Sequence, residues 1–301
     1  MIGKNLVSIG MPVFNDKKYL KIALDSILSQ SYKNFELIIS DDCSTDGSDE
    51  ICKIFQQADR RIRYIRQKQN IGISKNMEFL LKEADGKYFM WAGDDDVLDK
   101  DFIKSLIKPL LQNNGVISSY SPVKFIDNQG EILESIPARV TDYSARTKIQ
   151  RLFKLVTIFC DSMGYGLFIR EKIIGVEFPT WWWINKKNAI NNIYPTLCYY
   201  LVRGNFTLVG EKPLRYSRIK TKEEVNHKFP YNNQPIKSFF AFSLCKLNLV
   251  LFSLRLICKA EKNIISAIII SPIMFFFWFL LPVFKKLLST IKVEIRKEKI
   301  I

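Results

Sequence analysis

Three adjacent carboxylates stand one residue after a short apolar segment in the first third of the chain. Asp94, Asp95 and Asp96 follow Tyr88–Ala92. Neighbouring carboxylates repel one another unless a cation lies between them, and hard divalent ions such as Mg²⁺ and Mn²⁺ bind carboxylate oxygens together with those of a diphosphate. The triplet therefore indicates a divalent metal site that holds a diphosphate. The alternative is a solvated acidic turn that caps the next helix.

Polar residues that suit a nucleotide follow other apolar segments. Asp41 and Asp42 come directly after Phe35–Ser40. A carboxylate at that position can accept a hydrogen bond from a ring N–H of a base or bind ribose. Further residues offer a flat ring, backbone groups or room for close approach of a nucleotide: Pro12, Phe14, Asn15, Asn70 and Gly72.

Strand-like and helix-like segments alternate through the first 120 residues, and this order positions the polar residues. The expected strands are Leu6–Gly10, which we expect Pro12 to end, then Phe35–Ser40, Arg63–Ile65, Tyr88–Ala92 and Val116–Tyr120. The expected helices between them are Lys18–Gln30, Asp46–Gln57, Ser74–Glu83 and Lys100–Gln112. Such alternation predicts parallel βαβ units, in which a ligand binds outside the carboxyl ends of the strands. The polar residues should therefore converge on one edge of an α/β sheet.

The sequence from Val7 to Ser48, followed by NIGISKN and GKYFMWAGDDDVLDKDF, resembles glycosyltransferase family 2. The resemblance covers residues 5 to about 120 and implies a GT-A fold, a mostly parallel sheet flanked by helices. It also implies transfer of a sugar from a nucleotide-sugar donor, usually with inversion.

The resemblance assigns roles to the polar residues. It implies that Pro12, Phe14 and Asn15 border the base and ribose, that Asp42 reads the base, and that Asp41 lies beside it. It places the acidic metal motif on the triplet. Because Gly93 stands where the first Asp of that motif often is, we expect Asp95 to be nearest an Mn²⁺ or Mg²⁺ ion. Asp96 and Asp94 would assist, with Asp94 also against the nucleotide sugar.

The expected general base is missing from its usual place. Inverting members of the family usually carry a Glu-Asp pair shortly before a glycine such as Gly204. Residues 188–193 here read NAINNI and hold no acid, and an asparagine cannot take up a proton near neutral pH. Asp161 is the first candidate to replace the missing carboxylate and Glu177 the second. Asp161 could instead be a turn or capping residue.

The last third of the chain is basic and apolar. The net charge is +15, of which residues 203–301 carry +12, from 18 Lys and Arg against 6 Asp and Glu. Ile264–Phe284 is a 21-residue run without a charge, and about 20 apolar residues cross a bilayer as a helix. Phe239–Cys258 is apolar but contains Lys246 and Arg255, which suits an interfacial helix or a short second span. A buried helix is the alternative for the first run.

Composition excludes several other classes of protein. A hydrophobic content of 48% excludes a disordered chain. Six cysteines without CxxC spacing and a single histidine argue against a disulfide framework, a histidine zinc site and a Ser-His-Asp triad. A nucleic-acid partner is disfavoured because the basic residues flank apolar runs. Three arginines could contact a diphosphate or an anionic headgroup, or be simply solvated: Arg203, Arg215 and Arg218.

We therefore expect a GT-A domain over residues 1–235, with the nucleotide-sugar part at 1–120 and the acceptor part at 121–235. Membrane-associated helices and a basic tail would follow at 236–301. With no secretory signal at the N-terminus, the catalytic part is expected in the cytoplasm, at the cell membrane. The expected activity is sugar transfer onto a glycan or lipid-linked acceptor. The alternative is a membrane-bound nucleotide-sugar-binding protein that has lost its general base.

Overall fold

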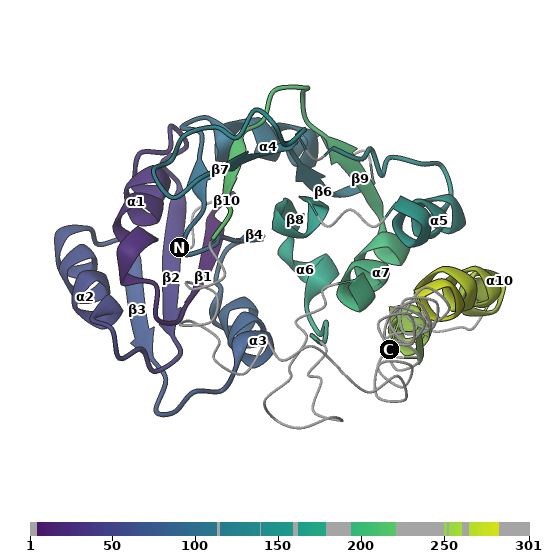
Figure 1. Cartoon of the computed structure of the whole chain (residues 1–301), viewed down its shortest axis with the longest axis horizontal. Coiled ribbons are helices and arrows are strands. Elements are labelled where there is room, and N and C mark those ends of the chain that lie inside the picture. The colour runs from purple at the N-terminus through teal and green to yellow at the C-terminus, as the bar shows by residue number, and fades with distance from the viewer. Residues whose placement is uncertain are drawn as a thin grey trace, which may run out of the picture.

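The computed structural model describes residues 5–112, 115–138, 140–158, 162–178, 194–220, 250–251, 253–260 and 265–282. Its centre is a seven-stranded sheet with the strand order β3-β2-β1-β4-β8-β6-β9 (Figure 1). The strands are β1 Val7–Val13, β2 Phe35–Asp41, β3 Ile62–Arg66, β4 Tyr88–Trp91, β6 Val116–Tyr120, β8 Leu167–Ile169 and β9 Asn205–Leu208.

The sheet is mostly parallel, as predicted. Strands β3, β2, β1 and β4 run parallel to one another, and β9 runs parallel to β6. Strand β8 is antiparallel to both of its neighbours, β4 and β6. All five strands expected in the first 120 residues are present, with ends within a few residues of the predicted ones.

Helices cover both faces of this sheet, because its central strands are apolar on both sides (Figure 1). On β2, Leu37 and Ile39 pack in one core with α1 and α4, whereas Ile38 packs in a second core with α3. The helices are α1 Lys17–Leu28, α2 Ser48–Ala58, α3 Ile73–Glu83, α4 Phe102–Leu111, α5 Lys148–Ile158, α6 Arg170–Ile173 and α7 Tyr194–Arg203. A 3₁₀ turn, η1, covers Ser162–Tyr165.

Strand β1 continues through Pro12, so the prediction that this proline ends the strand is wrong. The backbone groups of consecutive residues on β1 face opposite neighbouring strands. The carbonyl of Gly10 accepts a hydrogen bond from Ala92 on the β4 side, and the carbonyl of Val13 accepts one from Asp42 on the β2 side. Pro12 has the parity of Gly10, so its missing N–H falls on the β4 side, where pairing with β4 stops at Gly10. The proline therefore removes no ladder hydrogen bond.

A second, three-stranded sheet has the order β5-β10-β7, with β5 Val97–Leu98, β7 Val123–Ile126 and β10 Arg215–Arg218. Strand β10 pairs antiparallel with β5 and parallel with β7. Because β5 begins directly after Asp96, this pairing brings a segment from beyond position 210 to the acidic triplet.

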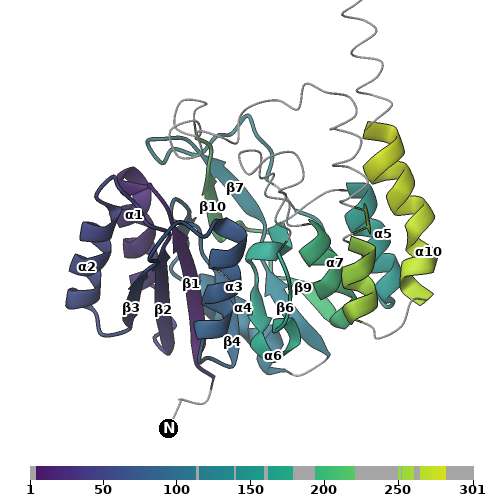
Figure 2. The ribbon, with the colours of Figure 1, turned by 90° about the horizontal axis from the view of Figure 1, so that it is seen from below.

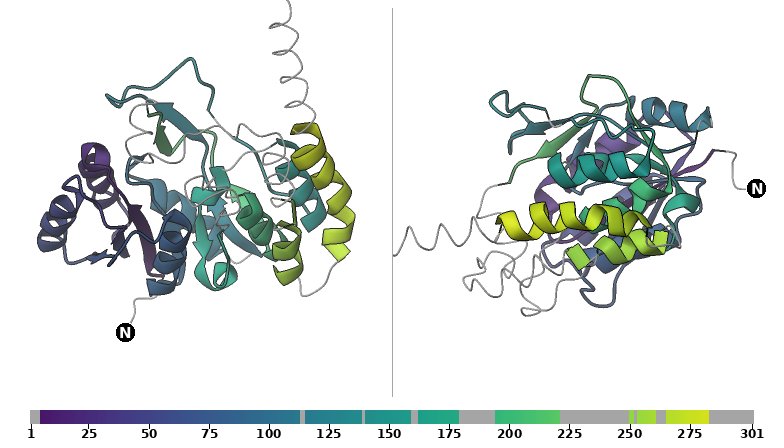
Figure 3. Two further views of the ribbon diagram at one scale, coloured as in Figure 1. Left: turned by 60° about the horizontal axis from the view of Figure 1, so that its bottom comes forward. Right: turned by 90° about the vertical axis from the view of Figure 1, so that its right-hand side faces the viewer.

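The C-terminal helices pack against the rest of the molecule. Helix α10, Ile265–Met274, lies beside α5 and continues as a π-helical turn over Phe275–Leu280 (Figures 2 and 3). Its buried residues are Ser266, Ala267, Ile270 and Met274. Residues 253–260 are also helical and join the same core. Among the described residues, no helix combines the length and the apolar character needed to span a membrane. The predicted boundary near 235 lies outside the described residues.

Candidate functional site

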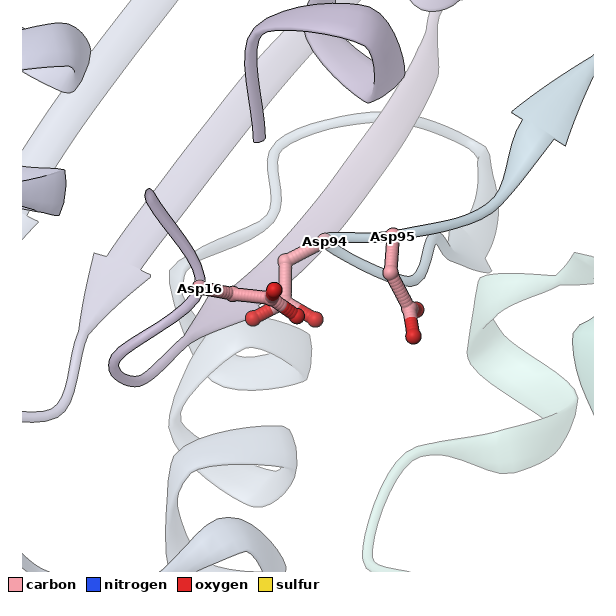
Figure 4. A group of neighbouring side chains, drawn as sticks. All are labelled: Asp16, Asp94 and Asp95. Atoms are coloured by element: carbon pink, nitrogen blue, oxygen red, sulfur yellow. The ribbon is translucent and has the colours of Figure 1, made fainter. Parts of the chain in front are cut away.

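Three carboxylates gather where β1 and β4 end side by side. Asp16 follows β1, Asp94 and Asp95 follow β4, and the carboxylate oxygens that they offer lie within 4.8 Å of one another (Figure 4). Asp16 and Asp94 are buried, and Asp95 is partly exposed. A set of hard oxygen donors this close together fits a divalent cation such as Mg²⁺ or Mn²⁺.

Asp16 was not among the residues that the sequence singled out for this site. It occupies the N-cap position of α1, where a helix cap is the ordinary role for an aspartate. Its side chain makes no capping hydrogen bond here and turns toward Asp94 instead (Figure 4). The signal available in the sequence was its place directly after the predicted nucleotide residues Phe14 and Asn15.

Asp96, a predicted metal ligand, pairs with an arginine and is not among the three carboxylates of this cluster. Its Oδ2 accepts a hydrogen bond of 2.8 Å from Nε of Arg215 on β10, and both side chains are buried. The guanidinium of Arg215 also stacks on Tyr165, 3.8 Å from the ring centroid. The pair holds β10 against the loop that carries the triplet. A metal-binding role for Asp96 stays a prediction.

Gly93 stands close to two carboxylates, at the position where the metal motif often has an aspartate. A Cβ at this position would lie 3.1 Å from Oδ1 of Asp95 and 3.1 Å from Cγ of Asp96. These separations are tighter than ordinary van der Waals contact. The glycine therefore leaves room for both neighbouring carboxylates, Asp95 in the cluster and Asp96 in its pair with Arg215.

Two cations from the β10 segment lie against the cluster. The ammonium of Lys220 pairs with the carboxylate of Asp16 and lies 2.8 Å from Oδ2 of Asp95. Arg218 stacks on the ring of Tyr19 at 4.3 Å and donates to the backbone carbonyl of Asp95 at 3.4 Å. The site therefore combines three carboxylates with a lysine that is 12% exposed.

Asp42 is anchored by backbone groups of the loop after β3. Its two carboxylate oxygens accept hydrogen bonds from the N–H groups of Ile71 at 2.7 Å and Gly72 at 2.9 Å. Burial raises the pKa of Asp42 above its ordinary value, although the bonds from Ile71 and Gly72 oppose this, and the charge of Asp41 adds to the rise. Gly72 has φ +83, a conformation that favours glycine, so its type is needed for this anchor.

Asp41 is fully buried and serves a hydrogen-bonded network. Its carboxylate accepts from the hydroxyl of Tyr64 at 2.9 Å, from Arg66 at 3.0 Å and from the N–H of Ser44 at 2.8 Å. Burial, together with the hydrogen bond to Asp41 and its charge, raises the pKa of Tyr64. These partners secure the end of β2.

The remaining predicted nucleotide residues join the strand ends to one another. Asn15 donates its N–H to Ser44 Oγ at 3.0 Å and accepts from Thr45 at 2.8 Å, which ties the loop after β1 to the loop after β2. The N–H of Phe14 lies 3.5 Å from Oδ2 of Asp94. Asn70 donates to the carbonyl of Asp42 at 3.2 Å. With Pro12 near the end of β1, the predicted residues lie along one edge of the sheet.

Of the two candidate bases, Glu177 lies within the residues that the structure describes. Glu177 pairs with Arg255 at 3.2 Å and with Lys259 at 2.6 Å, so its carboxylate faces the helical residues 253–260. Asp161 and the acid-free window 188–193 lie outside the described residues. Both assignments of a base stay predictions.

Curated relatives of the chain are glycosyltransferases. The chain is 38% identical over 217 residues to an uncharacterized glycosyltransferase of Rickettsia felis, a match that covers 70% of this chain and 35% of the relative. It is 35% identical over 130 residues to the glycosyltransferase GlyA of Streptococcus pneumoniae, which covers 43% of this chain and 18% of GlyA. The chain thus matches about a third or less of the length of these two relatives.

A solved structure supports the fold. The structure of this chain resembles that of residues 1–349 of S. aureus TarS in complex with UDP-GlcNAc, with a TM-score of 0.58 at 15% sequence identity. The alignment covers 85% of this chain and 71% of the TarS chain. At this identity the likeness concerns the fold alone, and it agrees with the GT-A arrangement of a mostly parallel sheet flanked by helices.

The family assignment rests on more than half of the chain. The family model described as glycosyl transferase family 2 matches residues 8–175. That range covers the strands from β1, except its first residue, to β8, and it includes all the carboxylates of the site described above. The resemblance expected from the strand-end motifs is therefore confirmed, and the chain belongs to glycosyltransferase family 2.

Proposed function

We propose that this chain transfers a sugar from a nucleotide-diphosphate sugar to a glycan or lipid-linked acceptor. The observation that carries the proposal is the meeting of Asp16, Asp94 and Asp95 at the strand ends where Asp42 is also anchored. A bound divalent cation would neutralise charge on the departing diphosphate. The loops after β1, β2 and β3 would orient the base and ribose beside it.

We propose further that transfer inverts the sugar, with an acid of the second half as general base. Asp161 stays the first candidate, because the carboxylate of Glu177 is engaged by Arg255 and Lys259. The base would take the proton from the acceptor hydroxyl as that oxygen attacks the sugar from the face opposite the diphosphate. Analysis of the product anomer tests the inversion.

We also propose that the enzyme works at the cytoplasmic surface of the cell membrane. Several apolar residues of α10 and of the π-helical turn that follows it are at least half exposed: Ile265, Ile268 and Ile269 in α10, and Phe276 in the turn. The basic C-terminal third supplies cations for anionic headgroups.

Co-sedimentation with vesicles tests the membrane proposal. The protein should bind vesicles that contain anionic lipid more strongly than neutral vesicles. The double change Ile268→Glu and Ile269→Glu should reduce binding, whereas Ile54→Glu, on the exposed face of α2, should leave it unchanged. Equal sedimentation of all variants would contradict the proposal.

The donor is tested by a thermal-shift screen of nucleotide sugars with Mn²⁺ or Mg²⁺, followed by a transfer assay. A ligand that binds the native state alone raises the unfolding temperature by mass action. Asp95→Ala should abolish the metal-dependent shift and turnover, whereas Asp25→Ala, on the exposed side of α1, should not. Retained binding and turnover in Asp95→Ala would overturn the site. Nucleotide binding without turnover would favour a non-catalytic binding protein.

A further inference from the structure

A side chain of the protein itself lies where the cluster would hold a cation. The ammonium of Lys220 contacts carboxylate oxygens of Asp16 and Asp95, two of the three residues whose oxygens approach one another. The lysine is 12% exposed, and Tyr19 lies 5.7 Å from its ammonium, measured to the ring centroid. The contact thus belongs to the interior of the site.

The charges explain why the lysine is held there and why it does not complete the site. The carboxylates of Asp16, Asp94 and Asp95 carry three negative charges when ionised, and one ammonium offsets only one of them. A net negative charge remains, which would repel a diphosphate. A divalent cation at the same position would offset two charges and also supply a ligand for phosphate oxygens.

The backbone near Lys220 is fixed while its side chain has a long stem. The N–H of Ile219 donates to the carbonyl of Ile126 at 2.9 Å, which extends the pairing of β10 with β7 by one residue. A lysine ammonium is a compact charge on four rotatable carbons. The ammonium can therefore leave the carboxylates by rotation of its side chain, with the strand still paired.

We propose that Lys220 is a built-in counter-ion that occupies the cation position between Asp16 and Asp95 when no donor is bound. A divalent cation then binds the cluster by displacing the ammonium, so Lys220 lowers the affinity of the donor-free enzyme for metal. The inference rests on the proposed metal site, but it concerns occupancy in the absence of donor.

Mn²⁺ binding to the full chain without nucleotide tests the exchange. The free ion is counted by its electron paramagnetic resonance signal. Lys220→Met should bind Mn²⁺ about tenfold more tightly than the unchanged protein, the factor that ~1.4 kcal/mol represents. Lys220→Arg keeps the charge and should bind no more tightly than the unchanged protein. Lys17→Met removes an exposed lysine beside Asp16 and controls for a general loss of positive charge.

The outcomes separate clearly. Equal or weaker Mn²⁺ binding by Lys220→Met would overturn the proposal, as would an equal gain in Lys17→Met. A second measurement needs no variant: amine labelling of Lys220 in the unchanged protein, followed by mass spectrometry, should be slow without Mn²⁺ and faster with it. Labelling that Mn²⁺ leaves unaltered would also overturn it.

Failure of this inference is distinct from failure of the proposed function, because neither measurement uses a donor or an acceptor. If sugar is transferred but Lys220→Met has an unaltered Mn²⁺ affinity, the counter-ion role is wrong and the proposed transfer stands. If Lys220→Met binds Mn²⁺ more tightly but no acceptor receives a sugar, the counter-ion role stands and the proposed transfer is wrong.

Discussion

Arg215 and Asp96 form an ion pair across 119 positions of the chain, with 2.8 Å between Nε and Oδ2. Their side chains are 9% and 7% exposed. The pair joins β10 to the segment that follows β4. It therefore fixes β10, and with it the position of Arg218 and Lys220 beside the carboxylate cluster.

We expect Arg215→Met to destabilise the fold strongly. Removal of one partner leaves a buried charge without its counter-ion, which costs about 3–5 kcal/mol. The double variant Arg215→Met with Asp96→Asn should recover part of this loss, because the side chain at position 96 is then neutral and no unpaired carboxylate is left buried. Urea unfolding of the single and double variants measures both. A double variant no more stable than the single one would contradict this reading.

Asp16→Asn should weaken metal binding although the sequence motif does not include this residue. It removes one of three carboxylates in the cluster, so we expect the affinity for Mn²⁺ in the presence of a nucleotide to fall by at least about tenfold. Asp25→Asn on the same helix makes the identical change on an exposed side chain and should have no effect. Titration calorimetry checks both. Equal affinities would remove Asp16 from the site.

Gly72→Ala should impair nucleotide binding through Asp42. At φ 83 and ψ 153 a side chain costs on the order of 1–3 kcal/mol, and relief of that strain would move the N–H that donates to Asp42. Gly130 has φ +93, and an added Cβ there would also meet open space. Gly130→Ala should therefore cost similar stability with no effect on nucleotide affinity. Equal affinity in both variants would contradict the anchoring role.

The stability of the helix α2 start should depend on pH through Asp46. Burial disfavours its charged form, but hydrogen bonds from Ser48 and Lys17 more than offset this and lower the pKa of Asp46 below 3.8. The carboxyl of Asp46 thus binds its proton less tightly in the folded protein than in the unfolded chain. Its contribution to the stability of the fold is complete above pH 3.8, the ordinary pKa, and is lost as the pH falls through the lower pKa of the folded state.

Asp46→Asn should therefore lower the free energy of unfolding at neutral pH, by less than about 1 kcal/mol because the side chain is only partly buried. The difference from the unchanged protein should shrink in acid. Urea unfolding across the acidic range measures it. A difference that stays constant with pH would show that the charge of Asp46 is not responsible.

Glu177→Gln should loosen the attachment of residues 253–260. The change weakens the ion pairs with Arg255 and Lys259, so hydrogen exchange of backbone amides in that helix should become faster. Glu171→Gln alters an exposed acid nearby in the chain and serves as the control. Loss of turnover without faster exchange would instead support Glu177 as the general base.

The elements of the first 120 residues could be predicted because each carries its own local signal. The strands are short apolar runs that are buried on both faces, as Leu37, Ile38 and Ile39 illustrate, and the helices repeat apolar residues at helical spacing. Pro12 misled the prediction because its effect depends on whether the neighbouring strand still needs a hydrogen bond at that position.

The sequence by itself determined the alternation of strands and helices, the edge where the strands end, and the presence of carboxylates there. These follow from local hydrophobic pattern and from the rule that parallel strands end together. Only the tertiary structure decided which carboxylates meet: Asp16 joins Asp94 and Asp95, whereas Asp96 turns to Arg215. It also brought Lys220 to the cluster, since pairing of β10 with β5 joins segments more than a hundred residues apart. Such long-range pairing is decided by the packing of the whole molecule and leaves no pattern in either segment alone.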